Sequence, residues 1–165
     1  SNLPRKFNIT LSGCPDDCVH AETQDLALVP AVQEKSGKSV YGFNILLGGK
    51  LGSGGYRIAT PLDVFLCPED VVEVCSALIL LYRDHGSRDV RNKNRLAFLV
   101  EDWGEKKFRS VLEERVGRPL TPAGVDLRGN EKSEHIGAYR QKQAFMNYVG
   151  LKIPVGRIRA EKLKG

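Results

Sequence analysis

The sequence has no hydrophobic run long enough to cross a membrane. Its longest apolar run, Ala77-Leu78-Ile79-Leu80-Leu81, is far shorter than the ~20 residues that a membrane-spanning helix needs. The first residues also lack the apolar stretch of a secretory signal peptide, and there is no internal repeat or low-complexity tract. At 165 residues the chain has the size of one ordinary domain. We therefore expect a soluble, cytoplasmic protein.

Cysteine, histidine and clustered charge are also scarce. Four cysteines in a chain of this length do not make a disulfide scaffold. The three histidines, His20, His85 and His135, are scattered, and none is ordered with a serine or cysteine as in a catalytic triad. The net charge of +5 suits an anionic ligand or an acidic partner. It fits nucleic acid only weakly, because the basic residues are interspersed with acidic ones.

What the sequence does contain is a short segment near its start in which apolar and polar residues strictly alternate. In a strand, successive side chains point to opposite faces, so Phe7, Ile9 and Leu11 would share one face. Lys6 and Asn8 would share the other. An ammonium and an amide two residues apart on a strand can converge on a small anion. The alternative is an edge strand with a solvated polar face.

Apolar spacing and turn residues predict the other elements of the chain. Val71, Cys75, Leu78 and Tyr82 recur at helical spacing and predict one buried helix stripe, which also includes Val72 and Ile79. A polar turn is expected at 35–39, a glycine-rich loop at 48–55 that ends at Tyr56-Arg57, and a polar linker from 118 to about 140. The expected strands are 6–12, 26–30, 41–47 and 148–153, and the expected helices are 68–86, about 90–102 and about 105–116.

Two glycine-containing motifs suggest phosphate or cofactor binding. Gly37-Lys38-Ser39 matches the end of a P-loop, but Val32 stands where the first glycine is required and no helix pattern follows. The loop at 48–55 is the better candidate, because glycines let backbone N–H groups approach a charged group closely. The alternative is a flexible connecting loop.

Cys14 and Cys18 have C-x-x-x-C spacing, with His20 two residues further on. Zinc would need a fourth ligand, and an iron–sulfur cluster normally takes four thiolates. The remaining cysteines, Cys67 and Cys75, lie at the start of a predicted helix and on its core stripe. Free thiols in a turn are the simpler interpretation, so we assign no metal ligand here.

Several motifs, taken in order, resemble those of the sirohaem-containing nitrite and sulfite reductases. They are NLPRKFN at 2–8, HAETQD at 20–25, GFNILLGG at 42–49 and GLKIPVGR at 150–157, together with RNKNR at 91–95 and EDWG at 101–104. The motifs occur along nearly the whole chain, and in combination they are highly specific. The resemblance implies an α+β fold in which a mixed or antiparallel sheet is flanked by helices.

The resemblance also implies a domain organisation. In enzymes of this family the chain looks internally duplicated. Each half consists of a ferredoxin-like half-domain and a domain that binds sirohaem and the cluster. By resemblance, residues 1–117 form most of the first such domain, 118–143 a linker, and 144–165 the start of the second ferredoxin-like half-domain. The cysteines that ligate the [4Fe–4S] cluster would lie elsewhere in the full-length enzyme. We therefore expect the chain on its own to bind no cofactor and to be inactive.

The function implied by the resemblance is the six-electron reduction of nitrite to ammonia, with ferredoxin as the usual electron donor. Lys6 and Asn8 would then contact the bound oxyanion. Asparagine at the second position favours nitrite, because sulfite as a dianion is expected to need a second cation. A sulfite reductase of the same family is the first alternative. A small cluster-bearing electron carrier and a basic, non-enzymatic binding module are two others.

Sirohaem carries many carboxylates, so its site must supply cations and backbone donors. The resemblance makes four basic residues candidates for these contacts, and two glycines candidates for close approach of the backbone to the macrocycle. The basic residues are Arg57, Arg91, Lys93 and Arg95, and the glycines are Gly48 and Gly49. Cys14 and Cys18 resemble a cysteine pair of the family's cluster motif, but the downstream start of a further half-domain argues against naming them as ligands.

Overall fold

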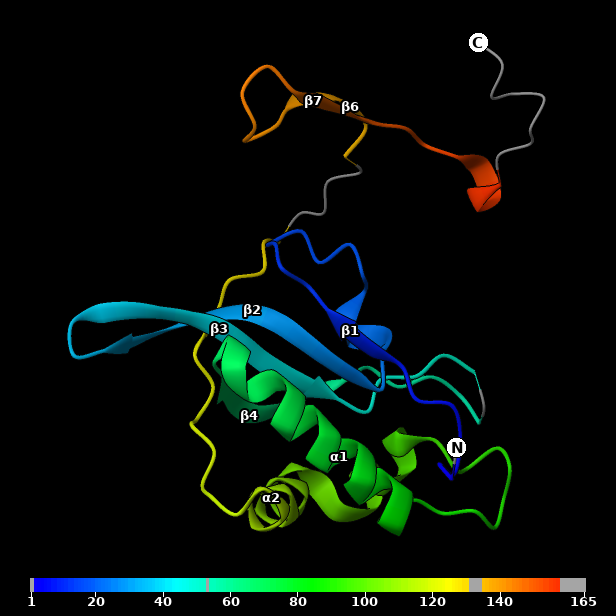
Figure 1. Ribbon diagram of the computed structural model, residues 1–165. Coiled ribbons are helices and arrows are strands. Elements are labelled where there is room, and N and C mark those ends of the chain that lie inside the picture. The colour runs from blue at the N-terminus through cyan, green and yellow to red at the C-terminus, as the bar shows by residue number, and fades with distance from the viewer. Residues whose placement is uncertain (1, 53, 131–134, 158–165) are drawn as a thin grey trace. The chain divides into compact units, whose positions relative to one another are not determined.

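The computed structural model describes residues 2–52, 54–130 and 135–157. The chain divides into two compact units, Ser1–Asn130 and Glu131–Gly165 (Figure 1). Within the described residues, no helix is both long and apolar enough to cross a membrane.

The first unit is built on one mixed sheet. Its main strands follow the order β1-β2-β3-β4, with β1 parallel to β2 and the other neighbours antiparallel. A short strand, β5, pairs with β2 beyond the end of β1. The strands are β1 (Ile9–Leu11), β2 (Leu26–Lys35), β3 (Lys38–Leu47), β4 (Thr60–Leu66) and β5 (Val125–Asp126). This architecture confirms the expected α+β fold with a mixed sheet.

The β2–β3 hairpin is longer than the sequence predicts. Its strands pair without interruption from Leu26 opposite Leu47 to Lys35 opposite Lys38. The turn is Ser36-Gly37, where both residues have positive φ, 53° and 74°, as tight hairpin turns require. The polar turn is therefore confirmed, and the P-loop-like motif lies in a hairpin turn with no helix after it.

Two helices cover one face of this sheet (Figure 1). A short 3₁₀ turn, η2 (Pro68–Asp70), leads into α1 (Val71–His85), which confirms the helix expected over 68–86. The second helix, α2 (Leu96–Val116), contains Gly104 in a non-helical conformation with φ 70° and ψ 163°. The two further helices expected from the sequence are thus the halves of α2. Residues 90–95 are not helical, which corrects the predicted start.

The main core lies between the sheet and these helices. Alternate residues of β2, β3 and β4 meet one face of α1 and both halves of α2. Val72 was expected on the buried stripe of α1 but is 76% exposed, because the face that packs is centred on Leu78 and Leu81. The largest fully buried side chains of this core are Tyr82, Phe108, Leu26, Leu28, Ile45, Leu47, Leu62, Leu66, Leu78, Leu81, Leu96 and Leu112.

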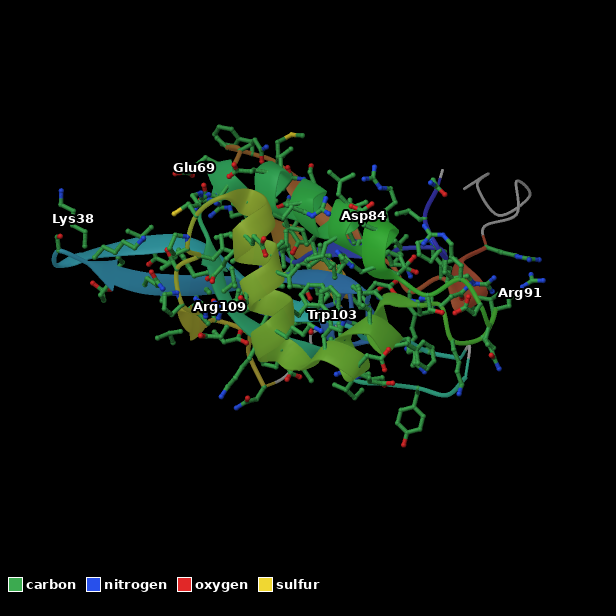
Figure 2. All side chains as sticks on the ribbon, turned by 90° about the horizontal axis from the view of Figure 1, so that it is seen from below. Lys38, Glu69, Asp84, Arg91, Trp103 and Arg109 are labelled. Atoms are coloured by element: carbon green, nitrogen blue, oxygen red, sulfur yellow. The ribbon has the colours of Figure 1, made fainter. Side chains whose placement is uncertain are left out.

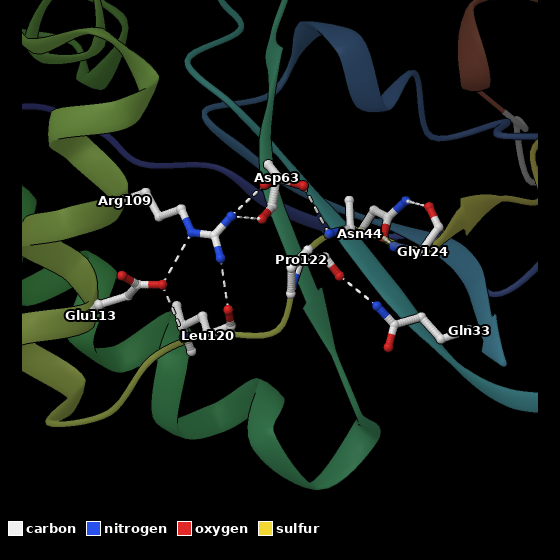
Figure 3. A network of polar contacts seen from close by, with 9 residues as sticks. Gln33, Asn44, Asp63, Arg109, Glu113, Leu120, Pro122 and Gly124 are labelled. Atoms are coloured by element: carbon white, nitrogen blue, oxygen red, sulfur yellow. Dashed lines mark hydrogen bonds and ion pairs between the residues drawn. The ribbon is translucent and has the colours of Figure 1, made fainter. Parts of the chain in front are cut away.

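After α2 the chain crosses the sheet as a belt, which we define as residues 119–128 (Figure 3). The backbone N–H of Phe65 in β4 donates to Thr121 O at 2.9 Å, and Asn44 of β3 exchanges two 2.8 Å hydrogen bonds with Gly124. Arg109 of α2 donates to Leu120 O at 2.7 Å. The start of the expected linker is therefore packed against the sheet, while the predicted domain boundaries remain predictions.

Among its described residues, 135–157, the second unit contains a small hairpin. Strands β6 (Gly137–Arg140) and β7 (Asn147–Gly150) pair antiparallel, and the rings of Tyr139 and Tyr148 stack with centroids 5.1 Å apart. A 3₁₀ turn, η3 (Pro154–Gly156), follows. The strand expected over 148–153 is wrong beyond Gly150, and β6 lies in the segment expected to be a linker.

Candidate functional site

Lys6 and Asn8 lie on an extended segment that leads into β1. Both residues are exposed, whereas Phe7 between them is partly buried, with its ring centroid 5.5 Å from that of Tyr82. This alternation places the ammonium and the amide on the outward side, as the sequence predicts. In the part of the chain that the structure describes, the Lys6 ammonium forms no hydrogen bond or ion pair, so it is available to an anion.

The rest of this segment differs from the prediction. Regular pairing begins only at Ile9, and Ile9 and Leu11 are 46% and 48% exposed. The expected strand over 6–12 is therefore confirmed only for Ile9–Leu11, and Ile9 and Leu11, which were expected to share a face with Phe7, are not buried with it. The reason is that the helical layer packs against β2, β3 and β4, and no residue of β1 belongs to the core.

Asp25 holds the backbone of Asn8 from inside the protein. Its carboxylate accepts the Asn8 N–H at 2.9 Å and two hydrogen bonds from the guanidinium of Arg95, at 2.9 and 2.7 Å. The side chains of Asp25 and Arg95 are 0% and 2% exposed. The carbonyl of Asn8 in turn accepts the N–H of Leu26 at 3.1 Å. The main chain of Asn8 is thus held on both sides.

Arg95 therefore has a different place from the one the resemblance implies. Its guanidinium forms a buried, two-pronged ion pair with Asp25, a strong and directional arrangement. Removing it would leave a buried carboxylate without its charge partner. The geometry assigns Arg95 to this internal pair and not to a surface that a bound group could reach.

Asn94, the neighbour of Arg95, holds the same N-terminal segment at a second point. Its side-chain amide donates to Pro4 O at 3.1 Å, and its backbone carbonyl accepts the Tyr82 hydroxyl at 2.5 Å. Burial raises the pKa of Tyr82 to about 12, so the hydroxyl stays protonated and remains a donor. Arg88 adds a third anchor at Asn2 O, 2.9 Å away. Sequence reasoning missed all three anchors.

Gly48 and Gly49 are needed for contact with the protein's own backbone. Their N–H groups donate to Asp25 O at 2.8 Å and Gln24 O at 2.9 Å. A Cβ atom at Gly49 would lie 2.5 Å from Glu22 O, a distance that side-chain carbons do not reach. Close approach was expected, but toward a macrocycle. Both N–H groups are already occupied within the protein.

The glycine loop is closed by Lys50 and Arg57. Their backbones form two hydrogen bonds across the loop, at 2.9 and 3.0 Å. Lys50 is only 2% exposed, and its ammonium donates to Gly55 O at 2.9 Å. Arg57 donates to Gly48 O at 3.1 Å and faces Glu101 at 3.4 Å. Arg57 thus braces the loop, which the sequence did not indicate. No role for Lys50 was expected from the sequence, although its buried ammonium holds the loop together.

Arg91 and Lys93 lie on the loop before α2, and both are exposed. Figure 2 shows Arg91 at the end of the first unit opposite to Lys38, which marks the hairpin tip. Over the described residues neither side chain forms a hydrogen bond or ion pair. The glycine loop approaches this segment, since a Cβ atom at Gly54 would lie 2.8 Å from Asn92 O.

Within the described part of the chain, Cys14 and Cys18 belong to no recognisable metal centre. Cys14 is half-buried and Cys18 exposed. Across residues 2–52, 54–130 and 135–157, no group of three or more histidine, cysteine, aspartate or glutamate side chains is placed to hold a metal ion. Cys75 is buried in the core, where desolvation raises the pKa of its thiol.

Comparison with known proteins supports the family suggested by the motifs. Residues 1–120 match the family model described as "Nitrite and sulphite reductase 4Fe-4S domain". The chain is 47% identical, over 97% of its length, to a ferredoxin–nitrite reductase from Leptolyngbya laminosa, and 42% identical, over 99%, to one from Synechococcus elongatus. It spans 31% of the length of each relative.

A solved structure shows the same fold. The Mycobacterium tuberculosis NirA protein superposes with a TM-score of 0.79 and 33% sequence identity, over 89% of this chain and 26% of that one. The chain belongs to the nitrite and sulfite reductase family.

Proposed function

We propose that this chain supplies part of the active site of an assimilatory, ferredoxin-dependent nitrite reductase. The observation that carries the proposal concerns two residues that lie close together in the sequence. The Lys6 ammonium is exposed and forms no hydrogen bond or ion pair among the described residues, and the backbone of Asn8 is hydrogen-bonded at both its N–H and its carbonyl. The names of the relatives, ferredoxin–nitrite reductase, support the substrate and the electron donor. Location in the cytoplasm is part of this proposal, although the relative from Zea mays is named as chloroplastic.

The proposed roles of Lys6 and Asn8 follow from their chemistry. Negative charge develops on the oxygens of nitrite as the N–O bonds break, and fixed donors stabilise that charge in a site that excludes water. The Lys6 ammonium supplies a full positive charge and a proton that it can pass to a departing oxygen. The Asn8 amide supplies a neutral N–H donor, which suits the single charge of nitrite.

The family implies sirohaem, and the exposed residues beside the glycine loop fit that group in part. A macrocycle rimmed with carboxylates needs cations beside apolar contacts, and Arg91 and Lys93 are exposed and uncommitted among the described residues. Tyr56, 81% exposed, and Leu51, 66% exposed, offer apolar surface on the neighbouring glycine loop. When bound in the full-length enzyme, sirohaem and the [4Fe–4S] cluster would carry electrons from the donor to nitrite.

The other candidates for cofactor contact have supporting roles in the proposal. Arg57 braces the glycine loop, and Gly48 and Gly49 let that loop pack against residues 22–25. Arg95 acts from inside through Asp25. These four residues would therefore shape the surface on which the macrocycle rests, while Arg91 and Lys93 would meet its carboxylates directly.

Sulfite is the second candidate substrate, because the matching family model describes both nitrite and sulfite reductases. Asn8 argues for nitrite, since a lysine at this position would give the site a second cation for the dianion. Relative turnover of the two substrates by the full-length enzyme decides between them.

The proposal is tested by replacing Lys6 with alanine in the full-length enzyme. We expect kcat/KM for nitrite to fall by roughly 10²-fold, the usual loss when a charge-stabilising donor is removed. The optical spectrum should stay close to that of the wild type. Lys38→Ala is the matched control, because Lys38 is also exposed but lies next to the hairpin turn. Equal turnover of the Lys6→Ala and Lys38→Ala enzymes would contradict the proposal.

A further inference from the structure

We infer that Asp25 is a positioning residue, which through its ion pair with Arg95 fixes the anion-binding segment at Asn8. The inference rests on the proposed function, in which Lys6 and Asn8 contact nitrite. Asp25 itself is buried and does not touch the substrate. Its effect would pass through one hydrogen bond, from the Asn8 N–H to the carboxylate oxygen Oδ2, 2.9 Å away.

The ion pair makes Asp25 a fixed acceptor. Arg95 donates to both carboxylate oxygens, so the plane of the carboxylate is set by a planar guanidinium. Both side chains are enclosed, which leaves the carboxylate little freedom to rotate. The backbone carbonyl of Asp25 also accepts the N–H of Gly48 at 2.8 Å. One residue therefore joins the anion-binding segment, the glycine loop and the start of α2.

The position of Asn8 matters because its side chain is short. With its N–H held by Asp25 and its carbonyl held by Leu26, the backbone of Asn8 is fixed, and only side-chain rotation remains. A group that must meet an anion loses much of its effect when it is displaced by about 1 Å. Fixing the main chain is thus the part of substrate recognition that Asp25 would supply.

A second anchor acts on the other side of Lys6. Asn94 donates to Pro4 O at 3.1 Å, and Asn94 and Arg95 are consecutive residues at the start of α2. The dipeptide Asn94-Arg95 therefore holds the segment both before and after Lys6, directly at Pro4 and through Asp25 at Asn8. This arrangement explains why two buried polar residues lie at the start of a helix otherwise anchored by apolar packing.

The test uses Asp25→Asn in the full-length enzyme, with Asp63→Asn as the matched control. Asp63 has the same kinds of partner, an arginine (Arg109) and a backbone N–H (Ala123), but lies on β4 against the belt (Figure 3). We expect Asp25→Asn to raise the nitrite KM by about tenfold, with a smaller change in kcat, because binding geometry and not electron transfer is altered. Asp63→Asn should leave the nitrite KM unchanged.

Hydrogen–deuterium exchange gives a readout independent of turnover. In Asp25→Asn, amides of peptides that contain Asn8 should exchange faster than in the wild type, since an amide facing a guanidinium is a poor replacement for the carboxylate. The same peptides should be unaffected by Asp63→Asn. Where Asp25→Asn does not fold, Arg95→Lys serves instead, because it keeps the charge and loses the two-pronged geometry.

Combining Asp25→Asn with Asn8→Ala separates this inference from the proposed function. If Asp25 acts through Asn8, Asp25→Asn has little further effect on the nitrite KM once Asn8→Ala has removed the side-chain amide. Additive effects of the two substitutions on the nitrite KM would overturn the positioning role of Asp25 while leaving the proposed nitrite reduction intact. Unchanged hydrogen–deuterium exchange of the peptides that contain Asn8 would do the same. A wild-type enzyme that does not reduce nitrite, or an Asn8→Ala enzyme with normal nitrite kinetics, would overturn both.

Discussion

The hydroxyl group of Tyr82 donates a hydrogen bond to the backbone carbonyl of Asn94, with 2.5 Å between the two oxygens. The ring of the same tyrosine packs against Phe7, with 5.5 Å between ring centroids. One fully buried side chain on α1 thus contacts both the N-terminal segment and the loop that anchors it. The candidate anion-binding segment is therefore supported by the helical core as well as by the Asp25–Arg95 pair.

Replacing Tyr82 with phenylalanine tests this contact. We expect the free energy of unfolding to fall by about 1–2 kcal/mol, because the buried Asn94 carbonyl loses its donor. Burial raises the folded-state pKa of Tyr82 to about 12, above its ordinary value of 10.0. The stabilisation is therefore complete below pH ~10 and is lost as the pH rises toward about 12.

Urea denaturation at several pH values measures both effects. Wild type should lose stability between pH ~10 and ~12, and Tyr82→Phe should lose less over the same interval because it has no phenol to ionise. Parallel losses in the two proteins would show that Tyr82 does not set this part of the pH dependence.

Gly49→Ala tests the close approach of the glycine loop to the backbone of residues 22–25. A Cβ atom there would lie 2.5 Å from Glu22 O and 2.7 Å from Gln24 O, so main chain would have to move. We expect a loss of roughly 3 kcal/mol or more in the free energy of unfolding, as for other forced shifts in packed regions.

Gly52→Ala is the control for Gly49→Ala. Gly52 has a φ of 73° but open space around its Cβ position, so only the left-handed conformation is penalised, at about 1 kcal/mol. Chemical denaturation of the two variants compares steric contact with backbone strain. If Gly52→Ala proved the more harmful, the packing argument for Gly49 would be wrong.

Apolar spacing and turn residues were sufficient to predict the helices, apart from the start of α2, and the strands and turn of the hairpin, but not the whole sheet. The apolar spacing in α1 and the break at Gly104 are local features, and both are present in the structure. β4 was missed because Pro61 and Asp63 are rare in strands, and Asp63 has a left-handed φ of 56°. Its position in the sheet depends on pairing with β3 and on contacts with the belt.

The candidate site was predicted only as far as its exposed residues. Alternation is a local pattern that can be read from neighbouring residues, and it indicates that Lys6 and Asn8 point outward. The partner of Arg95 is Asp25, 70 positions away, and no local pattern distinguishes a buried arginine from a solvated one at the start of a helix. The same limit applies to Asn94, whose partner Pro4 is 90 positions away.

Asn44→Ala tests the attachment of the belt to the sheet. The Asn44 side chain, on a residue only 8% exposed, both donates to Gly124 O and accepts from Gly124 N, at 2.8 Å each (Figure 3). Loss of this reciprocal pair should lower the free energy of unfolding by about 2–3 kcal/mol, because two backbone groups lose their partner. The measurement is urea denaturation.

Gln33→Ala is the control for the belt. Gln33 also donates to the belt, at Pro122 O, but this hydrogen bond is exposed to solvent. Water can replace it, so a change within about 0.5 kcal/mol is expected. A loss as large as that of Asn44→Ala would mean that the belt is held along its whole length and not mainly at Gly124.

Asn8→Lys tests whether Asn8, the second residue of the proposed anion-binding pair, sets the substrate. The proposed site has one cation, Lys6, which suits a monoanion. A second ammonium two residues away would attract the dianion more strongly, because Coulomb energy scales with the product of the charges. We expect the ratio of kcat/KM for sulfite to that for nitrite to rise at least about tenfold in the full-length enzyme, equivalent to about 1.4 kcal/mol. Asn8→Gln, which lengthens the side chain without adding charge, separates charge from size and should not raise the ratio. A ratio that stayed constant in Asn8→Lys while nitrite turnover remained normal would place Asn8 outside the anion site.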